Sequence, residues 1–136
     1  MSSLIAWAAD HLLRRREQRI EVHLRIHRAN LDVLNGRPIR PTDCYFLNLW
    51  NASPERSVQV THVWIETPSG HLSVLTRPLP VTIAQQHQWE TWIEVGQIPP
   101  STHVERDARA KLADGRVIES EPRNPDDLPP AGAVPG

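Results

Sequence analysis

The chain of 136 residues is long enough for one domain and too short for two ordinary ones, and its 39% hydrophobic content is sufficient for one compact core. The single cysteine, Cys44, excludes an internal disulfide and a multi-cysteine zinc site, so we expect a protein of a reducing compartment, cytoplasmic or virion-associated. The net charge of −1 is unevenly divided: residues 1–41 hold eight arginines against four acidic residues, whereas residues 42–136 hold seven basic against twelve acidic residues. A basic front of this kind favours contact with a phosphate-bearing surface or with the acidic body of another copy.

Residues 1–19 are predicted to form an amphipathic α-helix. Ser2 and Ser3 are favourable N-cap residues, and neither Gly nor Pro occurs from Leu4 to Arg19. Apolar side chains gather on one side of this helix and charged side chains on the other. The apolar stretch at its start, Leu4 to Ala9, is much shorter than the roughly 20 residues of a membrane span, so we expect neither a transmembrane helix nor a signal peptide.

The same segment contains most of the predicted partner-binding residues. An aromatic residue is followed by an arginine cluster, in the order Trp7, Arg14, Arg15, Arg16 and Arg19. These residues suit a helix that lies on an anionic membrane surface, where Trp sits at headgroup depth and Arg contacts lipid phosphate. They equally suit packing on the rest of the protein or on another chain, and the sequence leaves these alternatives open.

A strand is predicted directly after the helix. Apolar and polar residues alternate from Ile20 to His27, which is the pattern of a strand with one buried face. Asn35-Gly36 then predicts a type I′ hairpin turn. Pro38 and Pro41 disfavour a central strand, so we expect an edge strand and loop there.

Three apolar runs between Tyr45 and Leu75 predict the centre of the fold. Turn residues at 51–54 and at 67–70 separate the runs. Within the second run, Val58 and Val60 are out of phase with Val63 and Ile65, so we expect a β-bulge near Thr61 and His62 to reset the register.

The remaining chain predicts further strands and a tail. Val81 to Gln86 is predicted to cross between two sheets, and the alternation from Gln88 to Val95 predicts another half-buried strand. Asp114-Gly115 predicts a hairpin between the last two strands. Five prolines follow from Glu121 onward, so we expect residues 121–136 to form an extended, solvated tail.

These elements predict a mainly β protein. We expect one antiparallel immunoglobulin-like β-sandwich of about seven strands over residues 20–120, preceded by the helix over 1–19 and followed by the tail over 121–136. Short strands separated by turns, without long intervening helices, exclude a parallel sheet with helical crossovers.

Several short motifs resemble a loose group of uncharacterised proteins. The motifs are Tyr45-x-Leu47-x-Leu49-x-Asn51, Val58-x-Val60, Leu79-Pro80, the polar run ending at Trp92, and Asp114-Gly115-Arg116. Over roughly residues 20–120, they resemble β-sandwich proteins of GC-rich bacteria and their phages that place a helix before an immunoglobulin-like domain. The resemblance implies a helix followed by an immunoglobulin-like sandwich and supplies no catalytic residues. Members of the group often begin with a membrane span, and this sequence departs from them there.

The sequence contains no pattern that points to catalysis, a cofactor or a metal. His23 and His27 have the spacing of a helical zinc pair, but in a strand they lie about 13 Å apart. Glu90 and Glu94 are separated by a similar distance, too far for a glycosidase pair. There is no Gly-x-Ser-x-Gly, His-Glu-x-x-His or phosphate-binding glycine loop. We therefore expect no enzyme, no cofactor and no small-molecule substrate.

Trp92 is the predicted partner-binding residue of the sandwich. It shares a strand face with Gln88, Glu90 and Glu94, so the register places a large aromatic side chain among polar groups. Such a residue serves a protein interface or a sugar-stacking platform, unless the helix or a loop covers it. Trp50, Trp64 and Trp89 lie in apolar runs and are expected in the core.

Three functions remain in order of preference. The first is a non-catalytic structural or protein-interaction module, a subunit of a phage or phage-like assembly that binds protein partners or itself. The second is an accessory protein anchored to a membrane surface by the N-terminal helix. The third is a carbohydrate-binding module that uses Trp92. With a pI of about 6.6, the sequence does not support sequence-specific binding to nucleic acid.

Overall fold

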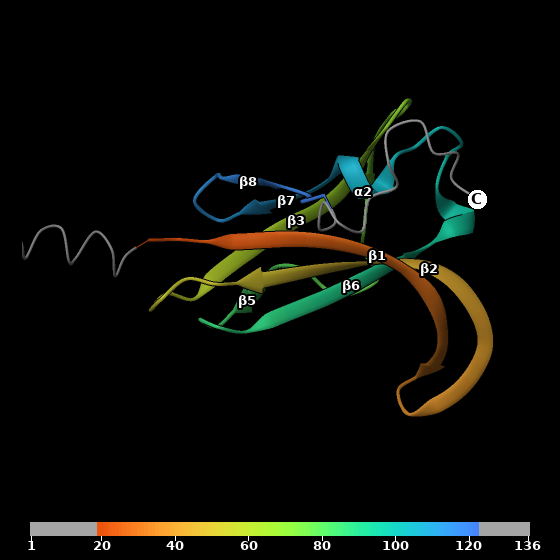
Figure 1. Cartoon of the computed structure of the whole chain (residues 1–136), viewed down its shortest axis with the longest axis horizontal. Coiled ribbons are helices and arrows are strands. Elements are labelled where there is room, and N and C mark those ends of the chain that lie inside the picture. The colour runs from red at the N-terminus through yellow and green to blue at the C-terminus, as the bar shows by residue number, and fades with distance from the viewer. Residues whose placement is uncertain (1–18, 123–136) are drawn as a thin grey trace, which may run out of the picture.

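The computed structural model describes residues 19–122, which form two antiparallel β-sheets packed face to face (Figure 1). Sheet A has the strand order β1-β2-β6, and sheet B has the order β4-β3-β7-β8, with β5 paired to β3. The strands are β1 (Val22–Leu34), β2 (Arg37–Asn51), β3 (Val58–Thr67), β4 (Gly70–Ser73), β5 (Val81–Ile83), β6 (Gln88–Glu94), β7 (Ala108–Leu112) and β8 (Val117–Glu119). The 3₁₀ turn η1 (Val95–Gln97) and the single helical turn α2 (Val104–Asp107) connect β6 to β7.

The predicted antiparallel, mainly β fold is therefore confirmed. The part of the chain that the structure describes has eight strands, one more than expected, because the predicted crossing contains the short strand β5. The helix predicted over 1–19 lies outside the described residues except for Arg19, which has irregular backbone before β1.

Alternation of side chains decides which face of each sheet is buried. In sheet A, cross-strand neighbours such as Leu24, Leu49 and Trp89 share the inner face, while their sequence neighbours point outward. The inner faces of both sheets supply one core, whose fully buried members include Leu47, Val60, Val63, Ile65 and Ala110. Burial of these apolar side chains is the main driving force for folding.

The bulge predicted in the third strand is confirmed. The pairing of β3 with β7 shifts between Val60 and His62, so Thr61 is the extra residue. Its hydroxyl donates to the carbonyl oxygen of Lys111 at 3.2 Å. The shift places Val60 and Val63 on the same inner face despite their odd spacing, and both are buried.

The hairpin between β1 and β2 is much longer than expected. Asn35 and Gly36 have φ angles of 54° and 75°, which are the positive values that a type I′ turn requires. The chain then forms β2 from Arg37, so the expected edge strand is confirmed and the expected loop is wrong. Pro38 and Pro41 are accommodated because this part of β2 lies beyond β6 and has a free edge.

The start of the predicted C-terminal tail is anchored to β1. The backbone N–H of Glu121 donates to the carbonyl oxygen of Leu24 at 2.8 Å, and the Glu121 carboxylate contacts His23 and Arg25. The prediction of a solvated tail is therefore wrong at Glu121, while residues 123–136 lie outside the described part.

Candidate interaction surfaces

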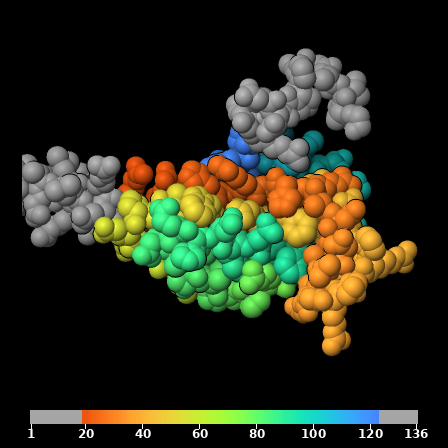
Figure 2. Space-filling model, turned by 60° about the horizontal axis from the view of Figure 1, so that its bottom comes forward, coloured from red at the N-terminus to blue at the C-terminus, as the bar shows by residue number. Residues whose placement is uncertain are grey.

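The outer face of sheet A has a row of three ring-bearing side chains, here called the aromatic row: His27, Phe46 and Trp92. They occupy paired positions on β1, β2 and β6. Figure 2 turns the lower side of Figure 1 toward the viewer and shows these three strands in sequence down the visible face. The predicted outward direction of Trp92 agrees with this register, and the side chain is half-buried.

The rings in this row cover one another. The His27 and Phe46 rings are stacked with centroids 5.1 Å apart and planes 9° apart, and Phe46 meets Trp92 at 6.4 Å with a tilt of 41°. Near-parallel rings on neighbouring strands cover each other's faces and leave edges toward solvent.

Cys44 lies two register positions along from the row, between Ala29 of β1 and Glu94 of β6. Its side chain is buried. Burial raises the pKa of the Cys44 thiol, and the negative charges of Glu94 and Asp43 act in the same direction. The thiol is therefore protonated and weakly nucleophilic at neutral pH.

Residues 29–43 form an extension of sheet A, here called the arm, in which β1 and β2 pair only with each other. Figure 1 shows the arm continuing past the end of the sandwich and curling toward the side on which β6 lies. Figure 2 shows it projecting from the body. Near its tip, Val33 is 52% exposed and Leu34 is 39% exposed. The arm thus presents apolar side chains away from the core.

Arg28 fixes the base of the arm. Its guanidinium donates two hydrogen bonds from Nε to the Asp43 carboxylate, at 3.0 and 3.1 Å, and lies over the Tyr45 ring at 5.6 Å. The hydrogen bond from Arg28 lowers the pKa of Asp43, and Asp43 raises the pKa of Arg28. Both groups are therefore ionised over the physiological range.

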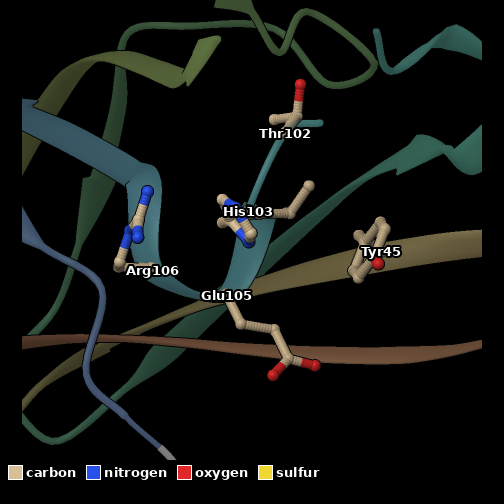
Figure 3. Close-up of a pocket in the computed structure, with 6 residues that line it drawn as sticks. Tyr45, Thr102, His103, Glu105 and Arg106 are labelled. Atoms are coloured by element: carbon tan, nitrogen blue, oxygen red, sulfur yellow. The ribbon is translucent and has the colours of Figure 1, made fainter. Parts of the chain in front are cut away.

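A shallow cavity of about 330 Å³ lies beside the base of the arm (Figure 3). Its lining residues are Tyr45, Thr102, His103, Val104, Glu105 and Arg106. Figure 3 shows the Glu105 and Arg106 side chains pointing to different sides of the cavity. Arg106 donates to the neighbouring Asp107 carboxylate at 3.0 and 2.9 Å. These charged groups do not converge on one point where a reacting atom would be held.

The structure describes only two of the predicted partner-binding residues. Arg19 is exposed, with its guanidinium 3.6 Å from the Glu21 carboxylate, and Trp92 lies in the aromatic row. The other four, Trp7, Arg14, Arg15 and Arg16, lie outside the described residues. Trp89 is buried as expected, but Trp50 and Trp64 are half-buried on outer faces, contrary to the core prediction.

The arm was missed by sequence reasoning. The apolar positions change phase after His27, from the even positions 20–26 to Ala29, Leu31 and Val33, so the alternation continues with the opposite face apolar. The prolines at 38 and 41 outweighed it, since they disfavour a central strand. Prolines are compatible with an edge strand. The pairing with β6 begins only at Cys44, and this shows that the earlier part of β2 is such an edge.

Two further findings concern the described residues. Within residues 19–122, no group of three or more His, Cys, Asp or Glu side chains is arranged to hold a metal ion. No helix in this range is long and apolar enough to cross a membrane.

We found no protein-family model, curated protein or solved structure that matches this chain.

Proposed function

We propose that this protein is a non-catalytic interaction or structural module that joins a larger assembly through its arm. The arm is the observation that carries the proposal, because residues 29–43 extend beyond the core and expose Val33 and Leu34. An isolated two-stranded ribbon is only marginally stable in water. A partner that covers its apolar tip removes that surface from water and stabilises the ribbon.

The strand order supports the immunoglobulin-like type of sandwich. The first, second and sixth strands form one sheet, and the third, seventh and eighth strands are neighbours in the other. This order corresponds to the A-B-E and C-F-G arrangements of immunoglobulin-like domains, with β4 added beside the C strand. Domains of this architecture serve as rigid frames for loops and extensions that bind partners.

The chemistry around the cavity also favours binding over catalysis. Its base, Tyr45, lies beneath the Arg28 guanidinium, and Arg106 is held by Asp107. Hydrogen bonding from Arg106 lowers the pKa of Asp107, which keeps that carboxylate a weak base at neutral pH. These charged groups are thus engaged in ion pairs and a cation–π contact within the protein.

A phage or phage-like virion component is a concrete form of this proposal. Residues 1–41 carry a net positive charge and residues 42–136 a net negative one, so the front of one copy and the body of its neighbour attract each other. Such attraction between exposed charges weakens as salt is added.

The proposal is tested by co-expression of the full chain with the products of adjacent genes, followed by purification and light scattering at low and high salt. The test variant joins Leu31 to Thr42 through Asn35-Gly36 and deletes residues 32–34 and 37–41, which shortens the arm and keeps the Arg28–Asp43 pair. We expect it to fold and to lose association. A strict monomer that binds none of the co-expressed proteins contradicts the proposal.

A matched pair of substitutions separates the arm from the rest of the surface. Val33 and Val117 are both half-exposed valines on strands, at 52% and 49%. Val33→Ser is expected to weaken association, whereas Val117→Ser, on β8, leaves it unchanged. Equal effects of the two substitutions would show that the arm has no special part in binding.

A further inference from the structure

The backbone edge of β1 is open along the arm. The carbonyl oxygen of Leu24 accepts a hydrogen bond from Glu121, so the backbone groups of Leu24 face away from β2. In an antiparallel pair the direction alternates, and the N–H and C=O groups of Ile26, Arg28 and Asn30 therefore face the same way. In the part of the chain that the structure describes, no strand pairs with this edge beyond Leu24.

The other edges of sheet A are blocked. On the free edge of β6, the carbonyl oxygen of Glu90 accepts a hydrogen bond from Arg77 Nη1 at 2.9 Å, and that of Trp92 accepts one from the Thr76 hydroxyl. On the arm portion of β2, Pro38 and Pro41 have no N–H to donate. Residues 26–34 of β1 contain no proline and form the edge that can accept another strand. The pairing of β1 with β2 shifts between Leu31 and Val33, where Asp32 alone faces residues 39–41 of β2, so the extra residues lie on β2 and not on this edge.

Two residues of opposite charge lie at equal distances on either side of Asn30 on this edge. Arg28 lies two residues before Asn30 and Asp32 lies two residues after it. If two copies pair antiparallel with Asn30 facing Asn30 across a two-fold axis, then Arg28 of each copy faces Asp32 of the other. Arg28 is already held in place by Asp43 and Tyr45, so little side-chain freedom is lost when it contacts a second carboxylate.

We propose that the arm binds a second copy of this chain by antiparallel pairing of the two β1 strands, with the two Asn30 residues on the two-fold axis. This names the partner of the arm and rests on the proposed function. The same register places Leu34 of each copy opposite Ile26 of the other and Leu31 opposite Ala29. Exposed Val33 then lies beside the partner's His27, at the end of the aromatic row.

The register separates the two sandwiches. The core of each copy ends at Ile26, which lies opposite the partner's Leu34. Along the shared ribbon, Ile26 of one copy and Ile26 of the other are therefore eight residues apart. At about 3.3 Å per residue, this is roughly 26 Å. The two bodies therefore stand at opposite ends of a shared four-stranded ribbon, and the interface is isologous, as in most homodimers.

Cross-linking of the full chain tests the register. Directly opposed Cα atoms in a hydrogen-bonded antiparallel pair lie about 5.5 Å apart, which is within the range of a disulfide. In a Cys44→Ala background, Asn30→Cys is expected to form a disulfide-linked dimer under mild oxidation. Ser69→Cys, in the exposed β3–β4 turn, is the matched control and is expected to remain monomeric under denaturing, non-reducing conditions.

Charge reversal gives an independent test. Asp32→Arg places two arginines opposite each other, and Arg28→Asp places two aspartates opposite each other, so each variant alone is expected to be monomeric by light scattering. An equimolar mixture restores both opposite-charge contacts and is expected to form a heterodimer. Glu55→Arg and Arg56→Asp, in the exposed β2–β3 loop, change the net charge equally and are expected to leave the dimer intact.

The outcomes separate this inference from the proposed function. A monomeric full chain, or a dimer that Asn30→Cys does not cross-link, overturns the inference. A monomer that nevertheless binds a co-expressed protein, and loses that binding when the arm is shortened, overturns the inference and retains the proposed function. A heterodimer that forms only from the mixed Asp32→Arg and Arg28→Asp chains supports the inference.

Discussion

The side-chain amide of Asn51 donates from Nδ2 to the carbonyl oxygen of Ile83 at 2.9 Å and so joins the end of β2 to β5 in the opposite sheet. The same Nδ2 donates to the carbonyl oxygen of Arg56 at 2.8 Å, and Oδ1 accepts from the backbone N–H of Ser53 at 3.0 Å. Asn51 is fully buried. One amide therefore satisfies three backbone groups, of which those of Ile83 and Ser53 form buried hydrogen bonds.

Asn51→Ala should destabilise the fold strongly, by about 2–4 kcal/mol, because it leaves buried backbone groups unpaired. Asn48→Ala is the matched control, since Asn48 makes one exposed hydrogen bond, to Gln88 at 3.0 Å. We expect a loss of about 0.5 kcal/mol or less there. Urea unfolding followed by tryptophan fluorescence measures both, and similar midpoints would contradict the assigned role of Asn51.

Leu47→Ala should lower the free energy of unfolding by about 2–5 kcal/mol, because Leu47 is fully buried between the sheets and its truncation leaves a cavity. Leu75 provides the control at 74% exposure, and Leu75→Ala should change stability by less than about 0.5 kcal/mol. Thermal unfolding by circular dichroism distinguishes the two. A comparable effect of both substitutions would mean that the core is wrongly placed.

Gly70→Ala should be destabilising by about 1–2 kcal/mol, although nothing lies within 4 Å of the added methyl group. The reason is conformational, because Gly70 has a φ of 123°, which residues with a Cβ rarely adopt. Gly96 also has open space around it and lies outside that φ range, so Gly96→Ala should be near neutral or stabilising. Chemical denaturation should therefore give a lower unfolding midpoint for Gly70→Ala than for Gly96→Ala.

The Cys44 thiol should react with iodoacetamide much more slowly in the native protein than in denaturant. Burial raises its pKa, which lowers the thiolate fraction at any given pH, and burial also restricts access. Raising the pH should speed the native reaction without reaching the denatured rate. Mass spectrometry of the alkylated protein follows both reactions, and equal rates at pH 8 would show that the thiol is exposed.

The Asp43 carboxylate should titrate below its ordinary range, because the hydrogen bond from Arg28 lowers its pKa in the folded state. In the unfolded chain an Asp titrates near about 3.9, so the pair contributes its stability above that pH, and the contribution is lost as the pH falls through the folded pKa. Carboxyl NMR measures the titration directly. Arg28→Gln should raise the Asp43 pKa, and an unchanged value would contradict the pairing.

Local chain chemistry was enough to predict several features. Asn35-Gly36 specified its own turn, because both residues tolerate positive φ. The odd spacing between Val60 and Val63 predicted the bulge, since only an extra residue keeps both on one face. Alternation around Trp92 predicted its outward direction from the same periodicity.

Other features depended on which strands become neighbours, and the sequence does not state this. Trp50 and Trp64 were expected in the core because they lie in apolar runs, whereas strict alternation with buried Leu49 and with buried Val63 and Ile65 places both on outer faces. Trp64 instead stacks on His71 of β4, with centroids 5.5 Å apart. The arm was missed because it requires β2 to continue beyond the point where β6 ends.

The side chains of Thr76 and Arg77 that bind the backbone of β6 have a consequence for growth of the sheet. Open strand edges are the usual starting points of fibrils, because each added chain presents a fresh edge to the next. Here two carbonyl oxygens on the β6 edge of sheet A accept from side chains of the same chain, prolines interrupt the arm portion of β2, and the edge of β1 is open along the arm. In the proposed dimer, the β1 edges of the two copies pair with each other, so edge-to-edge addition ends after one step and yields a closed pair in place of a polymer.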